Sequence, residues 1–281
     1  MNSCLLFVSL YLVFSSIYNV VYKVVSQNMK KAGSLTILIE IVASITSLAL
    51  MFLFKFKLPN NKFIYLLVLL SIIFYTIQNR LATTSRSKIK ASSYGILKQI
   101  SSIVVFFLGI LFLKEAVTIR RVIAFILLLL SNVVAFYSSF KNKFNKYLIL
   151  GVFANIFLGV ALFLDIITSK SFNISFYIFL ILFIPALINL FFEKISFNDL
   201  KTEWISNNKK LIILTGMCFP IMTITKLYAY KLGEVSFITP LCSLTVILNV
   251  LMSYVFLNEK VNVFKNLIAS TLIVIGLILL Q

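Results

Sequence analysis

Ten apolar segments follow one another along the chain, each about long enough to cross a lipid bilayer. They cover Cys4–Val25, Ser34–Phe54, Phe63–Leu81, Ala91–Leu113, Val122–Phe140, Tyr147–Thr168, Phe172–Phe192, Leu211–Tyr230, Val235–Leu257 and Val263–Leu280. A membrane-spanning helix needs about 20 mostly apolar residues to cross about 30 Å of hydrocarbon. Hydrophobic residues make up 61% of the 281 residues. We therefore expect an all-α membrane protein with ten transmembrane helices and almost no mass outside the bilayer.

The charged residues fit the same interpretation. The net charge is +18, but most of the 26 Lys and Arg residues lie in short gaps between apolar segments. Examples are Lys55, Lys57, Lys62, Arg86, Lys88, Lys90, Arg120, Arg121, Lys141, Lys143 and Lys146. Loop cations beside membrane helices contact lipid headgroups and set topology. Such scattered loops cannot form a basic groove, so we expect no nucleic-acid partner.

Several chemistries lack the residues they need. Cys4, Cys218 and Cys242 all lie inside apolar segments, no CxxC pair is present, and the chain contains no His. We therefore expect no disulfide, no metal and no cofactor. The P-loop, nucleophile-elbow and dinucleotide-binding patterns are missing, and no nucleophile–base pair can be assembled, so we do not expect an enzyme. The apolar start without a basic region predicts a retained first helix rather than a signal peptide.

The longest hydrophilic stretch, Glu193–Lys210, holds the only Trp of the chain, Trp204. Two interpretations stay open for it: a short amphipathic helix at the membrane interface, or a plain loop.

An internal repeat relates the two halves of the chain. Phe112-Leu113-Lys114-Glu115 ends the fourth segment, and Phe256-Leu257-Asn258-Glu259 ends the ninth, 144 residues later. The same register pairs Ser92 with Ser236 and Arg121 with Lys265. Because five helices are an odd number, the second half must lie upside down relative to the first. We expect two inverted five-helix repeats, 1–140 and 141–281, an architecture typical of secondary transporters.

The ninth and tenth segments carry a resemblance to a known family. Tyr228-Ala229-Tyr230-Lys231, Thr239-Pro240-Leu241, the Leu257–Glu259 element and Gly276 resemble the ten-helix EamA-like branch of the drug/metabolite transporter superfamily. In this family a Leu-Gly-Glu element ends the helix. This chain keeps the Leu and the Glu, but the Gly is replaced by Lys114 in the first half and by Asn258 in the second. The resemblance spans essentially the whole chain and implies a ten-helix transporter that works by alternating access.

A narrower resemblance covers the third and fourth segments. The spacing of Tyr75, Gln78-Asn79, Tyr94 and Gln99 is similar to that of nucleotide-sugar transporters in the same superfamily. Their substrate-site Lys corresponds to Ser101 here, and Lys98 lies one turn earlier. This resemblance implies, as an alternative function, an exchanger of nucleotide-sugar-like substrates.

Besides Lys265 at the start of the last segment, six charged residues lie inside the apolar segments. Lys23, Arg80, Lys98 and Lys226 are cations, and Glu40 and Asp165 are anions. Such residues usually face a cavity or a partner, although those near helix ends can extend toward the interface instead. Glu40 and Lys98 come at similar depth on parallel helices, so we expect them to form an ion pair, either in the substrate site or as a static link. The excess of positive charge favours an anionic or zwitterionic solute.

Polar and aromatic residues at helical spacing complete the candidate site. Close helix packing also explains Ser and Thr residues of this kind. The candidate substrate-binding residues are Tyr18, Asn19, Lys23, Glu40, Gln78, Asn79, Tyr94, Lys98, Asp165, Lys226, Tyr228, Ser236 and Thr239.

The leading hypothesis is a secondary active transporter, an exporter or exchanger, of a small anionic or zwitterionic metabolite. From another class, a non-transporting membrane partner or a lipid flippase stays open. The fifth and tenth segments carry few polar groups and could pair with a second copy in a homodimer. We expect a bacterial inner-membrane protein. The resemblance implies cytoplasmic termini, whereas the gaps on that side carry fewer cations than the opposite gaps, which favours the reverse orientation.

Overall fold

In the part of the chain that the structure describes, the regular secondary structure is α-helical. This computed structural model describes residues 2–89, 91–115, 118–136 and 146–257, with 268, 271–273, 275–276 and 278–279. The helices are α1 (Asn2–Gln27), α2 (Ala32–Met51), α3 (Lys62–Lys88), α4 (Ala91–Leu113), α5 (Ile119–Phe136), α6 (Lys146–Thr168), α7 (Ile174–Phe192), α8 (Phe197–Ser206), α9 (Lys209–Leu232), α10 (Val235–Ser243) and α11 (Thr245–Leu257).

Seven stretches within this part are long and apolar enough to cross a membrane. They correspond to α1, α2, α3, α6, α7 and α9, and to α10 and α11 taken together. The predicted all-α membrane class is confirmed, and the chain is an integral membrane protein. The segment expected at Val263–Leu280 is described only in part, and Asn258 and Glu259 lie outside the described residues.

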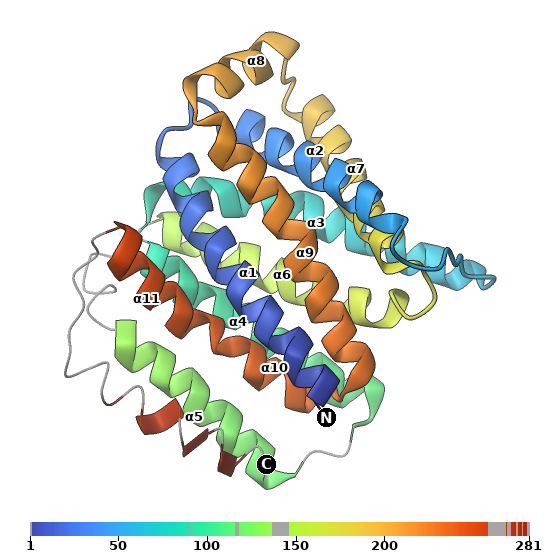
Figure 1. Ribbon diagram of the computed structural model, residues 1–281, viewed down its shortest axis with the longest axis vertical. Coiled ribbons are helices and arrows are strands. Elements are labelled where there is room, and N and C mark those ends of the chain that lie inside the picture. The colour runs from blue at the N-terminus through green and yellow to red at the C-terminus, as the bar shows by residue number, and fades with distance from the viewer. Residues whose placement is uncertain are drawn as a thin grey trace.

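The helices pack against one another in one bundle (Figure 1). The most extensive contacts join α3 to α6, α1 to α9, α2 to α7 and α4 to α6. In Figure 1, α5 lies at the edge of the bundle, and α8 lies at the end opposite the N-terminus. Most of the buried apolar side chains form one continuous core across these helices.

Helix α3 is longer than the sequence indicates. The third segment is expected to end at Leu81, but α3 continues to Lys88, where it meets the extended residue Ile89. Its start is fixed by Asn61, whose side chain accepts a hydrogen bond from the Phe63 N–H. The additional turns place Arg86 inside a helix with only 8% of its surface exposed. The prediction of Arg86 as a loop cation is therefore wrong.

The predicted ninth helix, Val235–Leu257, divides at Leu244 into α10 and α11. Pro240 lies inside α10 and removes one backbone donor. Next to the break, the Ser243 hydroxyl donates to the Pro240 carbonyl and the Thr245 hydroxyl donates to the Cys242 carbonyl. Gln99 of α4 reaches the freed region and donates to the Ser243 carbonyl at 3.4 Å.

The end of α4 explains one feature of its sequence motif. Lys114 has φ 52°, in the left-handed region that favours glycine. The chain then turns so that Glu115 accepts hydrogen bonds from the backbone N–H groups of Val235 and Ser236, both at 2.8 Å. A carboxylate at a helix N-terminus satisfies free donors and complements the helix dipole. Glu115 thus ties the end of α4 to the start of α10.

The hydrophilic stretch after α7 forms a helix, so the loop interpretation is wrong. Helix α8 begins at a capping box in which Ser196 and Asp199 exchange hydrogen bonds. The exposed Asp199 carboxylate accepts from the Ser196 backbone and side chain and pairs with Lys31, and these contacts hold its pKa below the ordinary value. Glu203, fully buried, accepts from the backbone N–H groups of Lys30 and Lys31. Helix α8 therefore holds the connection between α1 and α2.

Candidate functional site

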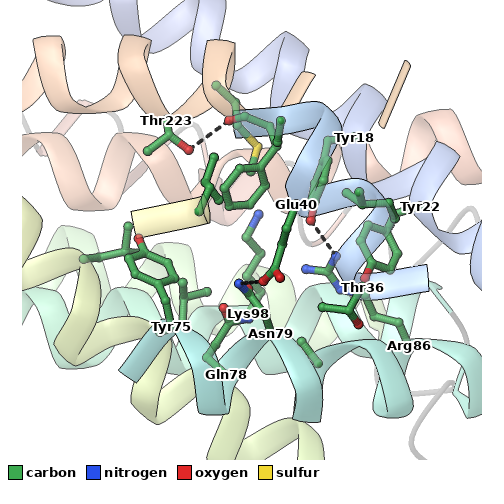
Figure 2. Close-up of a pocket in the computed structure, with 18 of the residues that line it drawn as sticks. Tyr18, Tyr22, Thr36, Glu40, Tyr75, Gln78, Asn79, Arg86, Lys98 and Thr223 are labelled. Atoms are coloured by element: carbon green, nitrogen blue, oxygen red, sulfur yellow. Dashed lines mark hydrogen bonds between the residues drawn. The ribbon is translucent and has the colours of Figure 1, made fainter. Parts of the chain in front are cut away.

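A partly open cavity lies among the helices, with about 750 Å³ of space when the open space at its mouth is included. Side chains from α1, α2, α3, α4, α6, α7 and α9 line it. One part of the lining is apolar and includes Ile39, Leu158, Leu162, Leu182 and Met222. The other part is polar, and Figure 2 shows its labelled side chains directed toward a common space. Such a mixed surface suits a small solute with a charged group and an apolar portion.

Arg86 of α3 is the most unusual residue of the lining. Its guanidinium lies over the rings of Tyr22 and Tyr94, at 4.5 and 4.6 Å from the ring centroids, and over Tyr18 at 5.3 Å. It donates one hydrogen bond to the Tyr18 hydroxyl at 3.2 Å, and its buried Nε has no hydrogen-bond partner. Within the described residues no carboxylate lies within ion-pair distance of Arg86. Aromatic faces attract this cation but leave donors unused.

Two lysines add positive charge to the same cavity. Lys98 of α4 donates to the Ser15 hydroxyl at 3.1 Å. Lys226 of α9 is buried and lies over Tyr11, 5.2 Å from the ring centroid. Neither has an acidic partner within ion-pair distance among the described residues. With Arg86, they form a group of three basic side chains around one space, here named the cation group.

Glu40 of α2 is the single acidic side chain of the lining. Its Oε1 accepts a hydrogen bond from the amide of Asn79, and its buried Oε2 has no partner. No ion pair joins Glu40 to Lys98, although both line the cavity, so this prediction is wrong. Equal depth along two helices does not determine where the two side chains point. Here Glu40 is directed to Asn79, and Lys98 is directed to Ser15.

Asp165 of α6 lies beside the cavity rather than in its lining. It is fully buried and accepts hydrogen bonds from Ser71 at 2.7 Å, Tyr75 at 2.6 Å and Tyr177 at 2.5 Å. Tyr75 itself lines the cavity, so it separates Asp165 from the open space. A carboxyl group whose oxygens all have hydroxyl donors is held in one position by α3 and α7.

The structure brings six of the predicted site residues into the cavity lining. These are Tyr18, Glu40, Gln78, Asn79, Lys98 and Lys226. Tyr94 contacts the cavity indirectly, through its ring against Arg86.

The remaining predicted residues lie elsewhere. Asn19 donates to Asn249, and Lys23 donates to the carbonyls of Arg86 and Ile89 at the end of α3. Tyr228 stacks on Phe7, 5.2 Å between ring centroids. Ser236 accepts from Arg121, and Thr239 bonds to Tyr230. These contacts join helices, which is the packing role that Ser and Thr often have in membranes.

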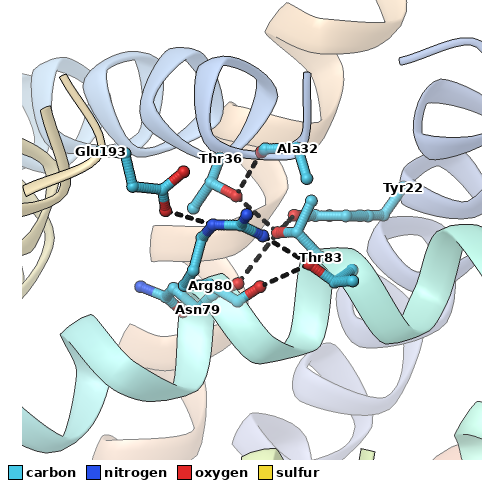
Figure 3. Close-up of polar contacts among 8 residues, drawn as sticks. Tyr22, Ala32, Thr36, Asn79, Arg80, Thr83 and Glu193 are labelled. Carbon is cyan, nitrogen blue, oxygen red and sulfur yellow. Dashed lines mark hydrogen bonds and ion pairs between the residues drawn. The ribbon is translucent and has the colours of Figure 1, made fainter. Parts of the chain in front are cut away.

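Arg80 was grouped with the embedded cations, but its side chain is 36% exposed and pairs with Glu193 at the end of α7. Figure 3 shows this pair beside a hydrogen-bonded chain of Tyr22, Thr36 and Thr83. Thr83 bonds to both Tyr22 and Thr36 at 2.6 Å. Helices α1, α2 and α3 are thereby joined at the end that faces α8.

The residues that sequence reasoning missed lie on the same helix faces as residues that it named. Tyr75, Gln78, Ala82 and Arg86 follow one face of α3, with spacings of three and four residues. Extending this stripe beyond Leu81 would have reached Arg86. Tyr11 lies two turns before Tyr18 on the same face of α1. Thr223 and Lys226 lie three residues apart on α9.

Comparisons with known proteins indicate the fold and nothing finer. No family model matches the chain, and no curated protein matches it. A solved structure described only as "Crystal structure of protein" is similar, with a TM-score of 0.76 and 13% sequence identity. The similarity covers 99% of this chain and 95% of that one. The described part of the chain therefore has a fold similar to that of this solved structure.

Proposed function

We propose that this protein is a secondary transporter that moves a small anionic or zwitterionic solute across a membrane by alternating access. The observation that carries the proposal is the cation group, Arg86, Lys98 and Lys226, which surrounds one cavity without an acidic partner in ion-pair distance among the described residues. Charged side chains are rare inside membrane proteins, and those without a partner mark solute pathways. An anionic group on the solute supplies the missing negative charge.

The proposal includes ten membrane helices in two inverted halves, with α10 and α11 counted as the ninth. Helix pairing supports it. The sixth membrane helix is α6 and the eighth is α9, since α8 is not counted. When the halves are exchanged, α1 changes places with α6, and α3 changes places with α9. The α1–α9 pairing therefore becomes the α6–α3 pairing. Both are among the most extensive contacts of the bundle. By the same exchange, the α4–α6 pairing becomes the pairing of α11 with α1. The α2–α9 pairing becomes the α7–α3 pairing. The structure contains all four of these pairings.

A single contact supports the same relation at residue level. Gln99 and Ser243 are 144 residues apart, the displacement of the repeated motif, and they touch each other. Two equivalent positions meet in this way only near an axis that relates the halves. Because the axis passes beside the cavity-lining helix α4, a solute bound there lies between the halves. Rocking of one half against the other then exposes it to alternate sides.

Transport measurements test the proposal directly. Protein reconstituted in phosphatidylcholine vesicles is offered a panel of labelled amino acids, carboxylates, phosphorylated metabolites and nucleotide sugars, with and without a proton gradient. We expect uptake of an anionic or zwitterionic member, lost in Arg86→Gln and kept in Arg120→Gln, whose exposed arginine lies outside the cavity. Absence of uptake, of exchange and of binding by thermal shift contradicts the proposal.

The same panel separates the competing functions. Uptake or stabilisation confined to nucleotide sugars favours the nucleotide-sugar exchanger. Movement of a labelled anionic phospholipid between leaflets, with no water-soluble solute transported, favours a flippase.

A further inference from the structure

Glu40 is a buried carboxyl group with one oxygen that nothing satisfies. Only 4% of the residue is exposed, Oε1 accepts from Asn79, and Oε2 has no hydrogen-bond partner. No Lys or Arg of the described chain lies within ion-pair distance of it. An ionised carboxylate in such a place is costly without a cation beside it. A static structural role therefore does not explain an acid at this position.

The charged and titratable groups around Glu40 are engaged elsewhere. They come from the helices packed around the cavity: Tyr18 and Tyr22 of α1, Tyr75 and Arg86 of α3, Lys98 of α4, Asp165 of α6 behind Tyr75, Glu193 at the end of α7 with its partner Arg80, and Lys226 of α9. Arg86 contacts three tyrosine rings, Lys98 donates to Ser15, and Lys226 lies over Tyr11. The cations raise the potential of the cavity without neutralising Glu40 by contact.

One face of α2 leads from Glu40 back to the start of the helix, near α8. Gly33, Thr36 and Glu40 follow each other at spacings of three and four residues, so they share a face of the helix. A side chain at Gly33 would collide with the carboxylate of Glu193, which shows how closely Glu193 approaches the start of this face. Glu193 pairs with Arg80, and both side chains are partly exposed, 21% and 36% (Figure 3). The Arg80–Glu193 pair thus stands between Glu40 and the α8 end of the bundle.

We propose that Glu40 is the proton-binding group of the transport cycle, and that it exchanges its proton with water past the Arg80–Glu193 pair. This rests on the proposed transport function. Transfer of a proton from a hydronium ion to Oε2 forms a carboxylic acid and leaves water, and the reverse transfer restores the carboxylate. Figure 2 shows the carboxyl group directed at Asn79, whose amide holds Oε1 while Oε2 takes the proton.

The direction of coupling follows from charge. Protonation of Glu40 removes the single negative charge of the lining and makes the cavity more attractive to an anion. Binding effects are reciprocal, so a bound anion also favours protonation of Glu40. Proton and anion therefore bind together and cross in the same direction.

Infrared difference spectroscopy on the protein in phosphatidylcholine vesicles tests the proposal with protons alone. Spectra are recorded between acidic and alkaline buffer, in H₂O and in D₂O, with no organic solute. Besides the bands of the exposed carboxyl groups, we expect a separate carbonyl band of a buried protonated carboxylic acid that shifts in D₂O. The band is lost in Glu40→Gln, is displaced in Glu40→Asp, and is kept in Asp165→Asn, the matched buried acid whose oxygens have hydroxyl donors.

A second measurement concerns the route. Arg80→Ala removes one side of the Arg80–Glu193 pair, and we expect the band to exchange into D₂O severalfold faster than in the unchanged protein. A band that survives in Glu40→Gln, or that is not displaced in Glu40→Asp, overturns the assignment of Glu40, and an unchanged exchange rate in Arg80→Ala overturns the route. These results are independent of the solute panel, because a chain that transports nothing can still titrate at Glu40 and a transporter can run without it.

Discussion

At the scale of single residues, the cavity is defined by side chains whose charge is only partly satisfied. Arg86 is held by three tyrosine faces and one hydroxyl, while its Nε stays without a partner. Cation–π contacts stabilise a guanidinium without occupying its fork of donors. The arrangement fixes the position of the cation and leaves it able to bind an anionic group in two-point geometry.

Substitution of Arg86 should therefore reduce solute binding more than stability. We expect Arg86→Gln to weaken binding of the anionic solute about tenfold to a hundredfold, since a hydrogen bond to a charged group contributes about 1.5–3 kcal/mol. Arg86→Lys should recover only part of the loss, because an ammonium group lacks the planar fork. Equilibrium binding and thermal unfolding of both variants, beside Arg120→Gln, give the two quantities. Equal losses in Arg86→Gln and Arg120→Gln would contradict the role of Arg86.

For single residues, the sequence predicts how deep a side chain lies along a membrane helix but not which way it points. Counting residues from segment ends identified Glu40 and Lys98, and both line the cavity. Their pairing could not be predicted, because the rotation of each helix about its axis comes from packing. Arg86 was missed because α3 continues past the point where its apolar pattern weakens. Tyr228 is not part of the lining and stacks on Phe7. Its position in the sequence does not distinguish a tyrosine that faces a cavity from one that stacks on another ring.

At the scale of the helices, two backbone features set how closely elements meet and how they end. Gly159 of α6 lies against α4 so closely that a Cβ would stand 2.5 Å from Val104 Cβ and 3.0 Å from the Ser101 carbonyl oxygen. Small residues allow such approaches between membrane helices. At the far end of α4, Lys114 takes a left-handed conformation before Glu115 reaches α10.

Filling the α4–α6 contact should destabilise the bundle. We expect Gly159→Ala to cost about 1–3 kcal/mol, the usual range for overpacking, because backbone as well as side-chain atoms oppose the new methyl group. Phe153→Ala, at a half-exposed position of the same helix, serves as the control. Unfolding in detergent measures both. If the Gly159→Ala variant is as stable as the unchanged protein, α4 and α6 can move apart to admit the methyl group without a loss of stability.

Relieving the left-handed residue should act in the opposite direction. Lys114→Gly removes the contact of Cβ with the backbone that disfavours φ 52°. The greater freedom of glycine in the unfolded chain offsets part of this gain, so we expect up to about 1 kcal/mol of stabilisation. Lys114→Ala keeps the Cβ and should give no gain in the same unfolding assay. Equal effects of the two changes would assign the result to the lost charge instead.

At the scale of the whole molecule, ion pairs connect the helices at both ends of the bundle. Arg80 pairs with Glu193 where α1 ends and α2 begins, near α8. Arg121 pairs with Glu234 where α1 begins, since the neighbouring Gly233 lies against Cys4. Exposed pairs of this kind contribute little stability, about 0–1 kcal/mol. They are therefore contacts that the proposed transport cycle could break and form again at small cost.

Locking either end should stop transport without removing the site. Cysteines are introduced at Arg80 and Glu193, or at Arg121 and Glu234, in a chain whose native Cys4, Cys218 and Cys242 are replaced by alanine. A bifunctional thiol reagent is expected to abolish uptake in each double variant, whereas each single variant stays active after treatment. Uptake that continues in a fully cross-linked protein would contradict alternating access through these ends.

The contact between Gln99 and Ser243 also has a consequence for the history of the chain. If the two halves descend from one duplicated gene, the ancestral protein was a pair of identical five-helix chains inserted in opposite directions. In that pair the position now held by Gln99 met its own copy, so every substitution there was made on both sides at once. Fusion of the genes released this constraint, and the two copies could then diverge into a long amide on one side and a small hydroxyl on the other.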